Sequence, residues 1–87
     1  MAHLAITTDG ICGSWSDKPT ELEALTDCAK ILKQDWRMPD DYRAVINTIE
    51  IPDDCTYSIR GLVVRVNGKP YDGEFKTHEG LLGDFIK

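Results

Sequence analysis

The chain lacks any hydrophobic run long enough to suggest a membrane segment. Among its 87 residues no apolar stretch approaches the roughly 18–20 residues that cross a bilayer. The opening residues, MAHLAITTDG, also lack the basic start and long apolar centre of a secretory signal. We therefore expect neither a transmembrane helix nor a signal peptide.

Basic residues are scarce and scattered. Ten lysines and arginines face fifteen aspartates and glutamates, which leaves a net charge of −5. Direct binding to DNA, RNA or an anionic membrane needs clustered positive charge, so these partners are disfavoured. An acidic chain suits a partner with a basic surface, although negative charge also serves solubility alone.

Cysteines are few, and no metal-binding motif accompanies them. Cys12, Cys28 and Cys55 are odd in number and widely spaced, unlike a disulfide-stapled secreted domain. We expect reduced thiols in a cytoplasmic protein. Cys-x-x-Cys, His-x-x-x-His and His-Glu-x-x-His are all missing, so no cofactor or metal is expected. A dispersed zinc site, or a Cys–His pair using His3 or His78, remains the alternative.

Cys12 lies in the stretch DGICGSWSD, which invites comparison with thiol proteases. Papain-type enzymes carry Cys-Gly-Ser-Cys-Trp, in which the second cysteine is the nucleophile. Here the run is Cys12-Gly13-Ser14-Trp15, so the reacting position is missing. The glycines also lack the spacing of a phosphate-binding loop. We therefore predict no catalytic residues.

The first half of the chain reads as two strands followed by a helix. Residues 3–8 and 11–15 flank Asp9-Gly10, a two-residue hairpin signal. Thr20 and Glu23 form a capping box that opens a helix expected to end near Arg37, because Met38 precedes a proline. The apolar stripe predicted on this helix consists of Leu22, Leu25, Ala29, Leu32 and Trp36.

The second half is dominated by β signals. Residues 45–51 hold five β-branched residues in seven, which predicts a strand over 43–51; a helix over the same stretch stays open. A strand ending at residue 66 leads into Asn67-Gly68, a hairpin pair, and residues 69–75 return. Gly61 suggests a bulge or a close approach by the helix, and Pro70 marks an edge strand. Thr77 is expected to cap a short final helix.

These elements, in the order ββ-α-βββ-α, predict an α+β fold in a single domain over residues 1–87. A mainly antiparallel sheet would form one layer of a two-layer sandwich, with the long helix on one of its faces.

Carboxylates and exposed aromatic residues are the candidate partner-binding groups. Two aspartate pairs bracket the middle strand, and two further acids lie on the expected edge strand. If residues 43–51 are extended, the pairs are separated by roughly 30 Å, too far for acid–base catalysis. Turn formation beside proline is the competing explanation for both pairs. The candidates are Asp40, Asp41, Asp53, Asp54, Asp72, Glu74, Trp15 and Tyr71.

Taken together, these features favour a small non-catalytic module that binds another protein. Its most specific form is an inhibitor or adaptor that occludes a basic, nucleic-acid-handling protein. In size, charge and lack of catalytic residues the chain resembles small phage-encoded anti-defence proteins, the anti-CRISPR proteins among them. The alternatives are an accessory subunit that forms homodimers through the sheet edge at residues 69–75, and a small Cys-dependent enzyme or metal protein.

Overall fold

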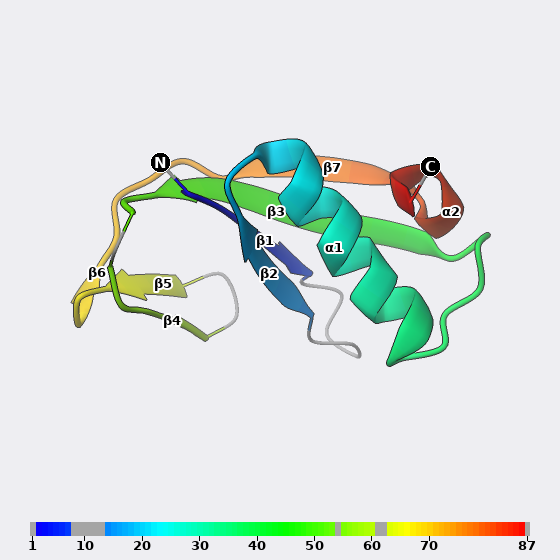
Figure 1. The fold of residues 1–87 in the computed structure, drawn as a ribbon, viewed down its shortest axis with the longest axis horizontal. Helices are drawn as coiled ribbons and strands as arrows, with labels where there is room; N and C mark the ends of the chain where they lie inside the picture. Colours follow the sequence, from blue (N-terminus) through cyan, green and yellow to red (C-terminus); the bar gives the residue numbers. More distant parts are fainter. Residues whose placement is uncertain (1, 8–13, 54, 61–62, 87) are drawn as a thin grey trace.

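A four-stranded antiparallel sheet forms the centre of the protein. The computed structural model describes residues 2–7, 14–53, 55–60 and 63–86 (Figure 1). Within them the main sheet has the order β2-β1-β3-β7. Its strands are β1 (Ala2–Thr7), β2 (Trp15–Lys18), β3 (Arg43–Ile51) and β7 (Lys76–Leu81). The predicted strand over 43–51 is therefore confirmed, and the helical alternative is wrong.

Helix α1 (Glu21–Gln34) covers one face of this sheet (Figure 1). Thr20 caps it as predicted, because its Oγ1 accepts a hydrogen bond from the Glu23 amide at 3.2 Å. The helix ends three residues before Arg37. Arg37 itself has a left-handed backbone, with φ of 54°, and the next amide donates to the Leu32 carbonyl at 3.2 Å. Helix termination therefore lies upstream of the Met38–Pro39 step.

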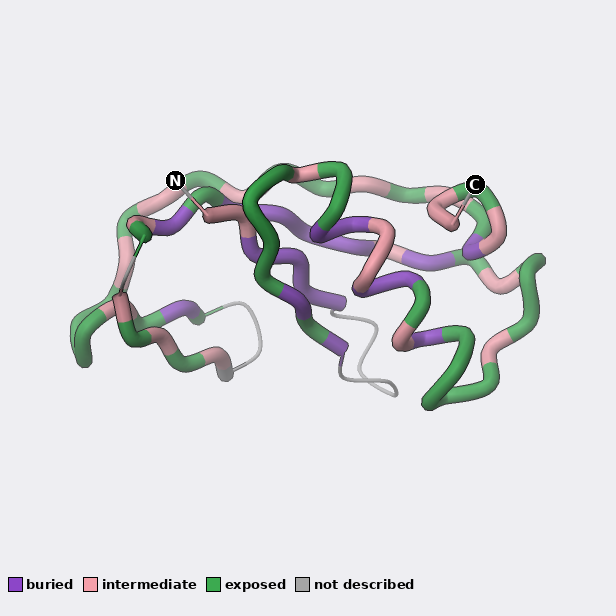
Figure 2. Tube along the Cα trace, in the orientation of Figure 1, coloured by how far each residue is buried: buried purple, intermediate pink, exposed green. Residues whose placement is uncertain are grey.

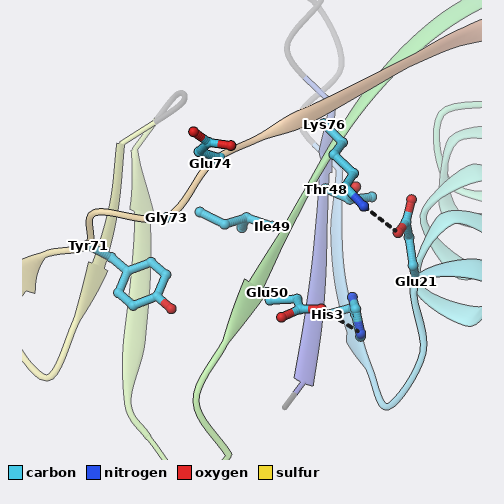
Figure 3. Close-up of a pocket in the computed structure, with 9 residues that line it drawn as sticks. All are labelled: His3, Glu21, Thr48, Ile49, Glu50, Tyr71, Gly73, Glu74 and Lys76. Atoms are coloured by element: carbon cyan, nitrogen blue, oxygen red, sulfur yellow. Dashed lines mark ion pairs between the residues drawn. The ribbon is translucent and has the colours of Figure 1, made fainter.

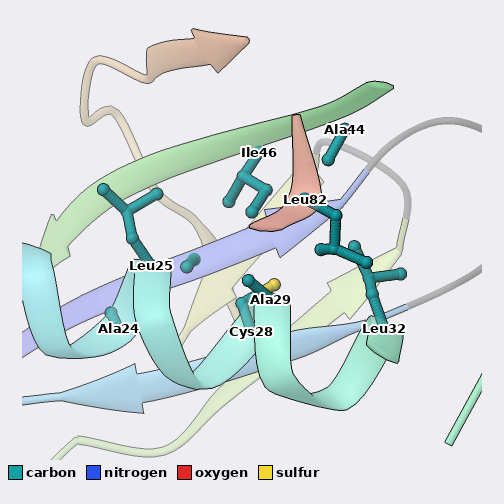
Figure 4. Packing of buried hydrophobic residues seen from close by; sticks show 9 residues of the cluster. Ala24, Leu25, Cys28, Ala29, Leu32, Ala44, Ile46 and Leu82 are labelled. Atoms are coloured by element: carbon teal, nitrogen blue, oxygen red, sulfur yellow. The ribbon is translucent and has the colours of Figure 1, made fainter. Parts of the chain in front are cut away.

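The core between α1 and the sheet is built from small and branched side chains (Figure 4). Ala5 on β1 and Ala44 on β3 let the helix lie close to the strands, and Leu32 fills the space between them. The predicted stripe is only partly right, since Leu22 is 73% exposed and Trp36 is 45% exposed. The buried face of α1 instead comprises Ala24, Leu25, Cys28, Ala29 and Leu32.

A second, three-stranded sheet packs on the other face of the main sheet. Its strands are β4 (Tyr57–Arg60), β5 (Val63–Val66) and β6 (Lys69–Pro70), in the order β4-β5-β6. Side chains alternate along β1, so Leu4 and Ile6 point away from α1 and meet Val64 of this sheet. Consecutive residues of β1 and β3 are therefore buried, as the purple segments of Figure 2 show, because alternate side chains of these strands pack into the two cores.

The single strand predicted to end at residue 66 is in fact a hairpin. β4 and β5 pair antiparallel, with Ile59 opposite Val64. Gly61, the expected bulge, lies outside the described residues, as do Asp9, Gly10, Cys12 and Gly13. The Asn67-Gly68 turn is confirmed, because both residues have positive φ, 53° and 81°. Pro70 does lie on an edge strand.

The end of the chain differs from the prediction. Only Lys69 and Pro70 of residues 69–75 are in a strand. Residues 76–81 form β7, so Thr77 is a strand residue rather than a helix cap, and α2 covers Leu82–Ile86. The α+β class with a helix layered on an antiparallel sheet is confirmed. Neither helix in the described part of the chain has the length and apolar character needed to cross a membrane.

Candidate functional site

A groove opens where β7 and β3 part. The two strands pair from Arg43–Leu81 down to Thr48–Lys76, but β3 continues to Ile51 without β7 beside it. The preceding segment, residues 71–75, runs instead towards the second sheet. The space left between them is a cavity of about 360 Å³ (Figure 3). We call it the β3–β7 groove; its lining residues are His3, Glu21, Thr48, Ile49, Glu50, Tyr71, Gly73, Glu74 and Lys76.

One part of the groove is apolar. Figure 3 shows the Ile49 side chain projecting from β3 towards Gly73 and the Tyr71 ring. A Cβ built on Gly73 would lie 2.7 Å from Ile49 Cδ1 and 2.6 Å from Tyr71 Cε2. The absence of a side chain at Gly73 therefore allows this close approach. Ile49 itself is only 3% exposed, so the apolar surface that a ligand can reach is that of the half-buried Tyr71 ring.

The rest of the groove is polar and predominantly acidic. Three carboxylates, those of Glu21, Glu50 and Glu74, line it together with one ammonium group, that of Lys76. Lys76 Nζ lies 3.9 Å from Glu21, and His3 Nε2 lies 3.8 Å from Glu50. Each pair joins an exposed side chain, Lys76 or Glu50, to a less exposed one, Glu21 or His3. Long ion pairs at the surface contribute only about 0–1 kcal/mol, so an incoming cation could replace these contacts.

A threonine, a histidine and a glutamate meet beside the groove and resemble a catalytic triad in composition. His78 Nε2 lies 3.0 Å from Thr48 Oγ1 and 3.0 Å from Glu21 Oε1. In a working triad the two ring nitrogens have separate partners, one the nucleophile and the other the carboxylate. Here both oxygens contact the same nitrogen. When Nε2 donates its proton to Glu21, that nitrogen has no lone pair left to accept the hydroxyl proton of Thr48. The three side chains therefore link α1, β3 and β7, and this arrangement does not activate Thr48 as a nucleophile.

Asp40, Asp41 and Asp53 do not line the groove. Asp40 and Asp41 precede β3, whereas Asp53 follows it, so they lie at opposite ends of a nine-residue strand. Asp40 has a structural role: its carboxylate pairs with Lys33 at 2.8 Å and its carbonyl accepts from the Gly83 amide at 3.0 Å. Asp41 and Asp53 are exposed, and Asp54 lies outside the described residues.

The other predicted binding residues are divided between two places. Glu74 and Tyr71 line the groove, and Asp72 is exposed between them. None of the three is in a strand, contrary to the predicted edge strand. Trp15 lies elsewhere: it is 53% exposed and its ring meets that of Tyr57 edge-on, with centroids 5.9 Å apart.

Sequence reasoning did not single out His3, Glu21, Thr48 or Glu50 as binding residues. Alternation along β3 places Thr48 and Glu50 on one face, and this much was readable from the strand prediction. Their meeting with Glu21 and Lys76 depends on strand order, which no local pattern in this sequence specifies.

The two described cysteines lie in different surroundings. No disulfide joins either of them to another described residue, and Cys28 is fully buried beside Ser14, with Sγ 3.5 Å from the Ser14 Oγ. Cys55 Sγ donates to the Pro52 carbonyl at 3.0 Å. Within the described residues no three His, Cys, Asp or Glu side chains are grouped as metal ligands would be.

No protein family model matches this chain, and no curated protein or solved structure shows significant similarity to it. The function is therefore argued from the groove and the surface alone.

Proposed function

We propose that this protein is a non-catalytic binding module whose acidic surface contacts a basic region of another protein. The observation that carries the proposal is the β3–β7 groove, which combines three carboxylates with the aromatic surface of the half-buried Tyr71. A site of this composition suits a ligand that is both cationic and partly apolar, as basic side chains of proteins are.

The net charge of −5 also favours a partner with a positively charged surface. Negative charge over the molecule speeds encounter with a positively charged partner and disfavours nucleic acid as a direct ligand. A partner that itself handles nucleic acid has the required basic surface. Occupying that surface would make this protein a stoichiometric inhibitor or adaptor, of the kind that small phage anti-defence proteins represent. We place it in the cytoplasm, because an odd number of widely spaced cysteines is typical of a protein that keeps its thiols reduced.

Affinity capture tests this proposal. Tagged protein is exposed to nuclease-treated lysate of its source cell, and captured proteins are identified and tested as purified components. The wild type is compared with Glu50→Gln/Glu74→Gln, which neutralises two groove carboxylates. Asp35→Asn/Glu79→Gln is the matched control, because it removes the same charge from two exposed positions outside the groove.

We expect a basic protein to bind wild type and control directly and to be lost from the groove variant. An additional variant, Asp41→Asn/Asp53→Asn, tests the aspartate pairs separately. Failure of every form to bind a basic protein, or tighter binding to heparin or DNA than to basic proteins at moderate salt, would contradict the proposal.

A homodimer joined through a sheet edge is the second candidate. Its supporting observation is that β7 lies at the end of the described main sheet and pairs with β3 alone. An edge strand of six residues is long enough to pair with a second copy. This candidate replaces the edge expected at residues 69–75 and predicts a molecular mass that doubles with increasing concentration in sedimentation experiments.

A further inference from the structure

We propose that the β3–β7 groove receives an arginine side chain of the partner. This inference rests on the proposed function and makes it more specific, because it names the chemical group that the groove recognises. It follows from the way in which the carboxylates and the apolar surface are distributed around the cavity.

The carboxylates approach the cavity from different elements. Glu21 comes from the start of α1, Glu50 from β3 and Glu74 from the segment that leads into β7 (Figure 3). A guanidinium group has five N–H donors spread around a plane, so it can donate to acceptors on more than one side at once. An ammonium group is a compact, strongly hydrated charge and gains less from acceptors that are spread apart.

The apolar part of the groove matches the rest of the side chain. The Tyr71 ring offers a face on which the guanidinium plane or the methylene stem of an arginine can stack. At about 360 Å³ the cavity has room for one such side chain and not for a folded element of the partner.

Without a ligand, the ammonium group of Lys76 pairs with a groove carboxylate. Its Nζ lies 3.9 Å from Glu21, and the side chain is 74% exposed. It is held loosely, so the arginine competes with it for the same carboxylate. Removing the Lys76 charge should therefore strengthen arginine binding, whereas removing a carboxylate should weaken it.

Amide NMR spectra of the full chain, titrated with the capped tripeptide acetyl-Gly-Arg-Gly-amide, test the inference without any partner protein. The same tripeptide with citrulline is the control, because citrulline keeps the shape of arginine and loses its charge. A lysine tripeptide tests the preference for guanidinium. We expect weak, saturable binding of the arginine peptide, with the largest shifts at groove residues such as Glu50, Gly73 and Lys76.

Variants of the groove should change the Kd of the arginine peptide in opposite directions. Glu50→Gln and Glu74→Gln should each raise the Kd of the arginine peptide about two- to fivefold, the range that exposed ion pairs allow. Lys76→Gln should lower the Kd by a similar factor. Glu79→Gln removes a carboxylate from β7 outside the groove and should change it little. The spectrum of each variant without peptide shows whether it is folded.

Equal binding of the citrulline or lysine peptide, or shifts centred away from the groove, would overturn the inference. So would an unchanged Kd in the carboxylate variants. A basic protein could still bind the groove carboxylates through another cationic group, so these results leave the capture experiment to decide the proposed function. Conversely, loss of all protein partners would contradict the proposed function and leave the peptide result standing, so the two proposals fail separately.

Discussion

The phenol oxygen of Tyr57 donates a hydrogen bond to the Asp17 carboxylate and so ties β4 of the second sheet to β2 of the main sheet. Burial of the phenol, followed by this bond to Asp17, raises the pKa of Tyr57 well above its ordinary value. The neutral phenol is therefore stabilised more in the folded protein than in the unfolded chain.

This raised pKa predicts a loss of stability in alkaline solution. The contribution of Tyr57 is fully present below about pH 10, where an unfolded tyrosine is neutral, and is lost as the pH rises through the folded-state value. Urea unfolding of wild type and Tyr57→Phe, followed from about pH 8 to about pH 11, measures it. The wild-type advantage should shrink above about pH 10. A difference that stays constant over the whole range would show that Tyr57 is not the group involved.

Gly73 should tolerate a methyl group poorly. Because an added Cβ would lie within 2.7 Å of Ile49 and within 2.6 Å of Tyr71, Gly73→Ala has to displace one of them. We expect it to lower the free energy of unfolding by about 1–3 kcal/mol. Gly80→Ala is the control, since the Cβ there would meet Phe85 at an ordinary 3.6 Å. Equal stability of the two variants in urea unfolding would contradict the close approach.

The two leucines of α1 should differ in their contribution to stability. Leu25 lies in the core beneath the helix, so Leu25→Ala should lower the free energy of unfolding by about 2–4 kcal/mol. Leu22 is 73% exposed, and Leu22→Ala should change it by less than about 0.5 kcal/mol. Thermal and urea unfolding of both variants measure the contrast. A large loss of unfolding free energy in Leu22→Ala would instead support the apolar stripe predicted from the sequence, which includes Leu22.

Thiol labelling should separate the two described cysteines. Cys28 is fully buried, whereas Cys55 is partly exposed, and a buried thiol reacts only when the structure opens around it. Native protein treated with iodoacetamide, digested and analysed by mass spectrometry, should show modification of Cys55 well before Cys28. In denaturing urea the two should react alike. Native labelling of both at one rate would argue against the buried position of Cys28.

Some elements were predictable because their signals are local. The Thr20–Glu23 capping box starts α1, the β-branched run gives β3 its observed bounds, and Asn67-Gly68 makes its turn with positive φ at both residues. Each depends on neighbouring residues, so each is readable without knowledge of the rest of the fold.

β7 was not predictable in this way. Its sequence, KTHEGL, has no regular alternation of apolar and polar residues, because it is an edge strand with mostly exposed side chains. Pairing with β3 stabilises it as a strand, and Thr77, which suggested a helix cap, lies opposite Asn47 in that pairing.

The groove was beyond prediction for a related reason. His3, Glu21, Glu50 and Glu74 come from four separate segments and meet only once the order β2-β1-β3-β7 is established. The predicted candidates Glu74 and Tyr71 do line it, whereas Asp40 is tied to Lys33 and to the start of α2.

The sheet order also governs how the chain reaches its native state. The central strands β1 and β3 bring Ala2 opposite Ile51, and β3 and β7 bring Arg43 opposite Leu81. These contacts close long loops, and proteins rich in such non-local pairings fold in about milliseconds to seconds. Helix α1 depends on local contacts, so we expect the pairing of distant strands, rather than helix formation, to limit the folding rate.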